Sequence, residues 1–352
     1  MESEKKLDEM IDPAKLKEAA SIAEGVLGQL DSILLGRPEL HKMVLVGILS
    51  QGHILLEGVP GVGKTALVKS LGELLNLGFN RVQFTPDLMP GDIVGTHILQ
   101  EKDSGKREMT FEPGPVFTNI LLADEINRAS PKTQSALLEA MQERCVTLLG
   151  KTRELPRPFF VLASQNPIEL EGTYPLPEAQ LDRFMFKLNV SGADADVLEE
   201  IITTRRRGEP PMPDKKLEKA DLDMLFEVMD AVFLPKAVAG YISRLVAATH
   251  PENGSPAKSV KEYVSYGASP RAAISIAEAS RAHAMISGRP TVGFDDVKAV
   301  AEHVLNHRMI LTYKARFDGL KTFDVINDIL ENVSDTGVEL GRDIEIAEES
   351  DA

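Results

Sequence analysis

A glycine-rich stretch between an apolar run and a helix-forming run constrains this chain more than any other feature of its sequence. It reads Gly58-Val59-Pro60-Gly61-Val62-Gly63-Lys64-Thr65 and matches the pattern G-x-x-x-x-G-K-[ST]. A strand-like run at 53–57 precedes it, and Ala66 and a helix-forming run follow. Glycines let backbone N–H groups turn inward without a Cβ clash, and a helix N-terminus adds partial positive charge. The pattern predicts a phosphate-binding loop, with an ordinary glycine-rich turn as the alternative.

The residue types in this stretch fit a nucleotide bound with Mg²⁺. We expect backbone groups of residues 58–66 to surround the phosphates, Lys64 to reach the β- and γ-phosphates and the Thr65 hydroxyl to ligate Mg²⁺. No N-K-x-D stretch, which would read a guanine base, occurs in the chain. The predicted ligands are therefore ATP and Mg²⁺.

Two carboxylates follow another apolar run. Asp124 and Glu125 come after the strand-like segment Asn119–Ala123. Ligands of open α/β sheets bind at the carboxyl ends of strands. We therefore expect Asp124 to hold Mg²⁺, mostly through water, and Glu125 to orient and deprotonate an attacking water. A pair of acids that caps a helix is the alternative.

A third strand-like run ends in a polar side chain. Phe159–Ala163 leads into Ser164, Gln165 and Asn166, which a proline follows. If this strand lies between the other two, the Asn166 amide points at the γ-phosphate and the attacking water. A turn that begins at Asn-Pro is the alternative.

Short apolar runs alternate with helical stretches in the first half of the chain and predict a parallel sheet covered on both faces. The runs are His53–Leu56, Val82–Phe84, Asn119–Ala123, Phe159–Ala163 and Met185–Val190. Two hairpins are predicted between them, one from Val94–Gln100 to Met109–Glu112 and one from Val146–Leu148 to Thr152–Leu155. Leu16, Ala20, Ala23, Leu27 and Leu30 mark one face of an N-terminal helix.

Strand signals vanish after about residue 192, which divides the chain into segments. We predict a nucleotide-binding α/β core with its N-terminal helix at 1–192, a linker helix and proline-rich connection at 193–213, and a small all-helical domain at 214–330. Residues 331–352 are strongly acidic and are expected to form a mobile tail.

Composition limits the classes of function. The net charge of −15 argues against sequence-independent binding of nucleic acid, because such binding depends on clustered Lys and Arg side chains. No apolar stretch approaches the length of a membrane helix, and the charged N-terminus does not resemble a signal peptide. With Cys145 as the only cysteine, no intramolecular disulfide is possible. We therefore expect a cytoplasmic protein without a transmembrane segment or a nucleic-acid partner.

These motifs together resemble those of AAA+ ATPases. Several stretches resemble the MoxR family more narrowly, over about residues 16 to 315. They are Asp124-Glu125-Ile126-Asn127-Arg128-Ala129, residues 134–141, Ala163–Pro167, Leu181-Asp182-Arg183-Phe184, Gly267-Ala268-Ser269-Pro270-Arg271-Ala272, and residues 111–117, which match the family's insertion within helix 2. The resemblance implies an AAA+ P-loop core with a helix-2 insertion and a hairpin before sensor 1, followed by a helical lid.

The resemblance also implies roles and partners. Asn166 would be sensor 1, Arg183 the arginine finger that reaches a neighbouring subunit's γ-phosphate, and Arg271 sensor 2, acting on its own or a neighbour's nucleotide. A surface arginine or a local salt bridge is the alternative for both arginines. The implied assembly is a homo-oligomeric ring, a hexamer by the resemblance, that works with a von Willebrand factor A domain protein and remodels or activates a client, as in metalloenzyme or complex maturation.

Two other functions compete with this one. Magnesium-chelatase-like and nucleic-acid-remodelling AAA+ motors share the helix-2 insertion, but the acidic charge weighs against nucleic acid. A scaffold that binds ATP without hydrolysing it is disfavoured because Lys64, Asp124, Glu125, Asn166 and Arg183 are all present.

Overall fold

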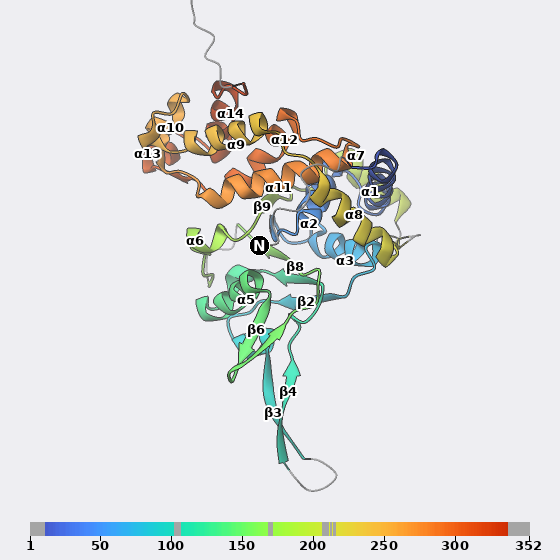
Figure 1. Ribbon diagram of the computed structural model, residues 1–352. Helices are drawn as coiled ribbons and strands as arrows, with labels where there is room; N and C mark the ends of the chain where they lie inside the picture. The colour runs from blue at the N-terminus through green and yellow to red at the C-terminus, as the bar shows by residue number, and fades with distance from the viewer. Residues whose placement is uncertain are drawn as a thin grey trace, which may run out of the picture.

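A five-stranded parallel sheet forms the centre of the N-terminal half of the chain (Figure 1). The computed structural model describes residues 11–101, 107–167, 172–205, 211, 213 and 216–336. The strands lie in the order β2-β5-β8-β1-β9 and span β1 (Ile54–Glu57), β2 (Phe79–Gln83), β5 (Ile120–Asp124), β8 (Phe160–Gln165) and β9 (Phe186–Asn189). Each of the five predicted runs overlaps one strand. Strand β8 lies between β5 and β1, as the expectation for Asn166 requires.

Both faces of the sheet are buried. Alternate residues of the strands enter two separate apolar clusters, Leu55, Leu121 and Val161 on one face and Leu122 and Leu162 on the other. This two-sided burial explains why the central strands are continuously apolar. The core helices are α2 (Pro38–Leu49), α3 (Lys64–Leu74), α4 (Pro90–Val94), α5 (Pro131–Glu143), α6 (Glu178–Leu181) and α7 (Ala195–Thr204).

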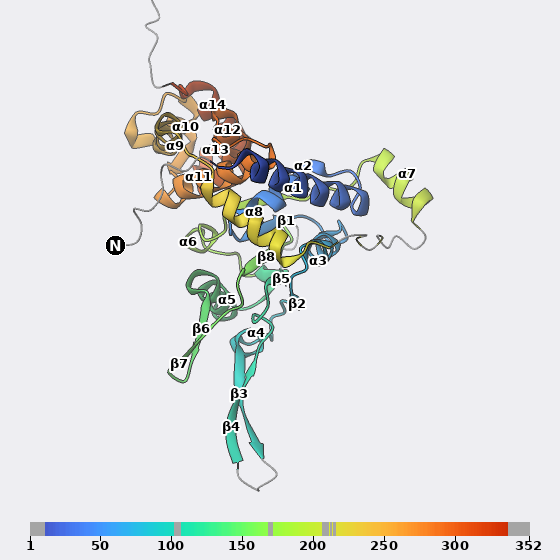
Figure 2. The same cartoon turned by 45° about the vertical axis from the view of Figure 1, so that its right-hand side comes forward.

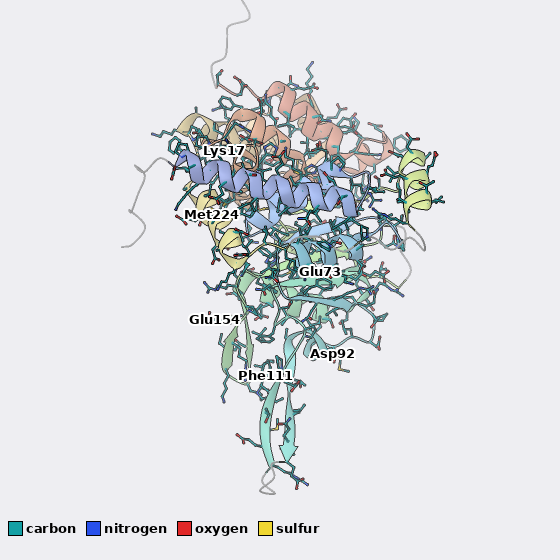
Figure 3. The ribbon with its side chains drawn as sticks, turned by 90° about the vertical axis from the view of Figure 1, so that its right-hand side faces the viewer. Lys17, Glu73, Asp92, Phe111, Glu154 and Met224 are labelled. Carbon is teal, nitrogen blue, oxygen red and sulfur yellow. The ribbon has the colours of Figure 1, made fainter. Side chains whose placement is uncertain are left out.

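Both predicted hairpins are present. They comprise β3 (Gly95–Glu101) with β4 (Arg107–Pro113), and β6 (Cys145–Leu148) with β7 (Lys151–Glu154). The β3–β4 hairpin projects away from the sheet, and Phe111 and Glu154 mark the two hairpins in Figure 3. The Arg153 guanidinium lies 3.9 Å from the Phe111 ring centroid and joins the hairpins. Residues 102–106, between the two strands of the β3–β4 hairpin, lie outside the described residues.

The C-terminal domain is helical, as predicted, apart from one short antiparallel ladder that the sequence did not indicate. Its helices are α8 (Lys219–Ala231), α9 (Lys236–Ala248), α10 (Lys258–Tyr263), α11 (Pro270–Ile286), α12 (Phe294–Leu305), α13 (Tyr313–Phe317) and α14 (Thr322–Asn332). A short antiparallel ladder pairs β10 (Val264–Tyr266) with β11 (Ile310–Leu311) across an irregular register. Strands this short carry no alternation that a sequence pattern could detect.

Helix α1 (Pro13–Ile33) packs against α8 and α11 of the helical domain as well as α2 and α3 of the core (Figure 2). Its buried face is turned slightly from the predicted one: Ala19 and Val26 are buried, whereas Ala20 and Leu27 are half-buried.

The predicted segment ends are only partly covered by the structure. Helix α14 continues to Asn332, past the boundary predicted at 330. Residues 337–352 of the predicted tail and most of the proline-rich connection at 206–213 lie outside the described residues. Within the described part of the chain, no helix is both long and apolar enough to cross a membrane.

Candidate functional site

The glycine-rich loop connects β1 to α3, as its sequence predicts. Gly61 and Gly63 have φ angles of 82° and 90°, a left-handed conformation that favours glycine. A Cβ on Gly58 would lie 2.5 Å from the Val190 carbonyl oxygen, so only glycine fits there. Lys64 is 7% exposed, and its Nζ donates a hydrogen bond of 2.6 Å to the Gly58 carbonyl. This hydrogen bond holds the Lys64 ammonium against the first residue of the loop.

The electrostatics around Lys64 suit a phosphate-binding cation. Burial lowers the pKa of the Lys64 ammonium, and the nearby carboxylates of Asp124, Glu125 and Glu57 act to raise it. The positive charge of Lys64 among these carboxylates reduces their electrostatic repulsion of an anionic ligand. The loop thus combines glycines in the left-handed region, a helix N-terminus and a partly desolvated ammonium.

A cavity of about 550 Å³ lies beside residues 60–64. Its apolar lining includes Leu34 of the α1–α2 connection, Leu40 of α2, and Leu198 and Ile201 of α7. Arg37 donates hydrogen bonds to the Val62 carbonyl and, at 2.7 Å, to the Ser191 carbonyl, which fastens the loop to the chain after β9. A volume of this size with apolar walls beside a phosphate-binding loop suits a nucleotide base and ribose.

Asp124 ends β5 and is 8% exposed. One carboxylate oxygen accepts a hydrogen bond of 2.5 Å from Ser164 Oγ, and the other lies 2.7 Å from Arg81 Nη2. With the Thr65 hydroxyl on the first turn of α3, Asp124 offers the oxygen donors that Mg²⁺ prefers. The donor set therefore fits Mg²⁺.

Glu125 has a φ of 56°, a left-handed conformation rare for a residue with a side chain. Its Oε2 accepts hydrogen bonds from Gln83 Nε2 at 2.7 Å and from Arg128 Nη1 at 2.9 Å. Gln83 Oε1 also accepts from Arg81, so one chain of hydrogen bonds links both acids. Neither Arg81 nor Gln83 was predicted as a site residue, although Gln83 lies in the predicted run Val82–Phe84 and Arg81 directly precedes it.

Asn166 follows β8 directly and is 4% exposed. Because β8 lies between β5 and β1, Asn166 stands between Asp124 and the glycine-rich loop at the same edge of the sheet. The structure thus brings together the predicted loop, both acids and Asn166 at the carboxyl ends of three adjacent strands.

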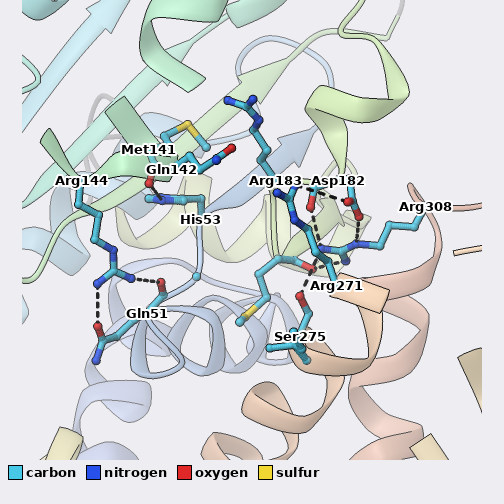
Figure 4. Close-up of a pocket in the computed structure, with 13 residues that line it drawn as sticks. Gln51, His53, Met141, Gln142, Arg144, Asp182, Arg183, Arg271, Ser275 and Arg308 are labelled. Carbon is cyan, nitrogen blue, oxygen red and sulfur yellow. Dashed lines mark hydrogen bonds and ion pairs between the residues drawn. The ribbon is translucent and has the colours of Figure 1, made fainter. Parts of the chain in front are cut away.

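The two predicted arginines lie elsewhere. Arg183 and Arg271 line a second cavity of about 280 Å³ between the core and α11 (Figure 4). Arg183 Nη1 donates a hydrogen bond of 2.8 Å to the Leu138 carbonyl of α5, and Arg271 Nη1 lies 3.6 Å from Asp182 Oδ2. Neither arginine is among the described residues that line the cavity beside the glycine-rich loop.

The parallel sheet, the glycine-rich loop between β1 and α3, and the acids at the end of β5 define a P-loop protein of the AAA+ class. Residues 53–186 match the model of the ATPase family associated with various cellular activities, and residues 256–329 match an AAA lid domain. The Chaperone MoxR1 of Mycobacterium tuberculosis is 46% identical over 88% of this chain and 81% of its own length. The chain belongs to the MoxR family of AAA+ ATPases.

Other relatives agree with this assignment. The Protein MoxR of Methylorubrum extorquens is 29% identical over 82% of this chain and 85% of its own length. A crystal structure described as a candidate ATPase from Cytophaga hutchinsonii is 39% identical, with a TM-score of 0.82 over 91% of this chain and 97% of the other.

Proposed function

We propose that this chain binds and hydrolyses ATP in a homo-oligomeric ring and uses the energy to remodel or activate partner proteins. The loop residues 58–66 bind the phosphates, and the cavity lined by Leu34 and Leu198 takes the base. Thr65 and Asp124 hold Mg²⁺, which neutralises charge on the β- and γ-phosphates when it is bound. Glu125 positions and deprotonates the attacking water, and the Asn166 amide orients it.

The observation that carries this proposal is the separation of the arginines from the loop. Arg183 and Arg271 share one cavity, whereas the P-loop borders another. Arg37, Arg81 and Arg128 also lie at the site, but they bind the Val62 carbonyl, Asp124 and Glu125 respectively. A guanidinium on the transferred phosphoryl group is worth ~10³–10⁵ in rate, so we infer that another arginine supplies it. In a ring, each subunit would present Arg183 and Arg271 to the nucleotide of its neighbour. On this proposal Arg271 acts in trans, the alternative that its sequence position left open.

The projecting hairpin supports contact with other proteins. Leu99 on β3 and Met109 on β4 are 59% and 55% exposed and form a register pair. Exposed apolar side chains on a projecting element are typical of interaction sites. We propose a client protein and a von Willebrand factor A domain protein as partners, a hexameric ring and a cytoplasmic location, following the family resemblance.

The test uses the proposed action of Arg183 on the nucleotide of a neighbouring subunit. Turnover per subunit should rise with protein concentration, in step with a ring-sized species in light scattering. Arg183→Ala should lose most turnover yet bind a fluorescent ATP analogue as the parent does. Mixing it with Lys64→Ala should restore activity, because one variant keeps an intact pocket and the other an intact finger. Arg316→Ala, at an exposed arginine of α13, is the control.

Absence of rescue in rings shown to contain both variants would contradict the proposal. A separate pull-down identifies the client. It uses Glu125→Gln in the presence of ATP, because this variant should bind ATP without hydrolysing it and so hold the client-bound state.

A further inference from the structure

The most completely bonded arginine among the described residues outside the nucleotide site is Arg308, between α12 and β11. Its side chain is 2% exposed. Nε donates to Asp182 Oδ1 at 2.9 Å, and Nη1 donates to the carbonyls of Met185 and Val304 at 3.0 and 2.7 Å. Nη2 donates to the carbonyls of Asp182 and Phe184 at 3.2 and 2.7 Å. The acceptors at residues 182, 184 and 185 all belong to the segment that carries Arg183.

This arrangement ties the C-terminal domain to the backbone on both sides of Arg183. The carbonyls of Asp182 and Phe184, one residue before and one after Arg183, bind the same Nη2 of Arg308. A planar guanidinium with five N–H donors fixes several acceptors at once, which an ammonium with three donors cannot reproduce. Arg308 therefore holds the peptide that presents Arg183.

The Asp182 carboxylate extends the same network to the other arginine. Ser269 Oγ, at the N-cap of α11, lies 3.0 Å from both Asp182 oxygens, and Arg271 Nη1 lies 3.6 Å from Oδ2. Figure 4 shows Arg271 and Arg308 beside this carboxylate, whereas the Arg183 side chain points away from it. The Arg183 guanidinium instead binds the Leu138 carbonyl. One pair of side chains, Asp182 of the core and the buried Arg308 of the helical domain, thus contacts both the backbone that carries Arg183 and the Arg271 side chain. We call this pair the anchor.

We propose that Arg308 is a positioning residue that sets Arg183 and Arg271 for the nucleotide of the neighbouring subunit. The inference rests on the proposed trans role of these arginines. Arg308 touches neither nucleotide nor reacting atoms and acts through the Asp182–Met185 backbone and the Asp182 carboxylate. Because the anchor belongs to both domains, a shift of the helical domain in one subunit changes the hydrolysis rate in the next one.

The test compares Arg308→Gln with Arg289→Gln. Arg289 is the control because its guanidinium also pairs with a carboxylate, with Nη1 donating to Asp296 Oδ2 at 2.7 Å within the helical domain. Its side-chain hydrogen bonds go to Asp296 alone among the described residues, so they do not reach the 182–185 segment. For each assembled variant, the affinity for a fluorescent ATP analogue, the turnover, and the turnover after mixing with Lys64→Ala are measured.

We expect Arg308→Gln to lose about 10- to 100-fold in turnover, the cost of a misplaced catalytic group. Its nucleotide affinity should stay within about twofold of the parent value, because its own pocket is intact. Mixing with Lys64→Ala should restore turnover, as for Arg183→Ala. The turnover of Arg308→Lys should lie between those of the parent and of Arg308→Gln, and Arg289→Gln should keep the parent turnover.

Three outcomes overturn the inference. Parent-like turnover of assembled Arg308→Gln, while Arg183→Ala is inactive and rescued, removes the positioning role and leaves the trans finger in place. Loss of turnover without rescue on mixing assigns Arg308 a structural role alone. Parent-like turnover of Arg183→Ala refutes the proposed function itself, and this inference with it. If Arg308→Gln does not assemble, Asp182→Asn decides by the same rescue, because it keeps the oxygen facing Arg308 and removes the charge facing Arg271.

Discussion

His53, at the start of β1, offers a prediction whose size follows from the structure. The residue is 8% exposed, and its imidazole ring is neutral in the folded chain near neutral pH. Its Nδ1 accepts from the Val161 N–H at 3.0 Å, and its Nε2 lies 3.1 Å from the Met141 carbonyl. Burial lowers the pKa of His53 from 6.5 to about 4, with a smaller lowering from Arg144. Protonation therefore favours the unfolded chain.

The sign and the window follow from the two pKa values. Between about pH 6.5 and 4 the unfolded histidine binds more protons than the folded one, so the free energy of unfolding falls as pH falls. One pKa unit corresponds to about 1.4 kcal/mol. At about pH 5 the unfolded histidine is almost fully protonated and the folded one about one-tenth, which costs about 2 kcal/mol relative to neutral pH. That is a sizeable part of a typical stability of 5–15 kcal/mol.

The assay compares His53→Asn with the parent by urea denaturation, followed by circular dichroism across this pH range. The variant loses the Met141 contact and should be less stable near neutral pH, by about 1–3 kcal/mol. Its stability should nevertheless fall less on acidification, by about 2 kcal/mol. His307, whose pKa burial also lowers, is present in both proteins and cancels in the difference.

Above about pH 7.5 the offset between the two proteins should be constant, which serves as the internal control. Equal losses of stability in parent and variant between neutral pH and about pH 5 would refute the reasoning.

Three further predictions concern the nucleotide site. Lys64→Ala should weaken ATP binding by about 10- to 100-fold in a fluorescence titration, since it removes a charged donor worth about 1.5–3 kcal/mol, whereas Lys69→Ala, at an exposed position of the same helix, should not. Glu125→Gln should keep that affinity and lose about 10²–10⁴-fold in phosphate release; turnover near the parent's would place the base elsewhere. Gln83→Ala frees Glu125 from one of its two donors and should raise basal phosphate release about two- to tenfold, in line with one lost hydrogen bond. A lower rate would show that this contact positions Glu125 productively.

Sequence patterns predicted the strands best where both faces of a strand are buried. Strand β8 was placed within one or two residues because every position from Phe160 to Ala163 is buried. Strand β2 begins three residues before the predicted run at Val82, since an edge strand carries polar residues such as Asn80 and Arg81 that lack an apolar signal.

The nucleotide site was predictable to the extent that it follows from strand ends. Parallel strands bring their carboxyl ends to one edge, so Lys64, Asp124 and Asn166 could be placed together from sequence alone. The bonds that orient these groups could not be. Arg81 meets Asp124 across 43 residues, and Arg308 meets Asp182 across 126. Such pairs depend on side-chain geometry that no local periodicity encodes.

The strand order also determines when the molecule can form during synthesis. Strand β1 leaves the ribosome early, yet both its sheet neighbours are encoded far downstream: Ile54 pairs with Leu162 and Phe186. At roughly 5–20 residues per second, the 108 residues between Ile54 and Leu162 take about 5–20 s to appear. During that interval the apolar strand and the loop behind it have no sheet to join. The nascent chain is therefore exposed to aggregation until β8 emerges. The phosphate-binding loop reaches its working shape only after Val190, which packs against Gly58, has followed, when more than half of the 352 residues have been made.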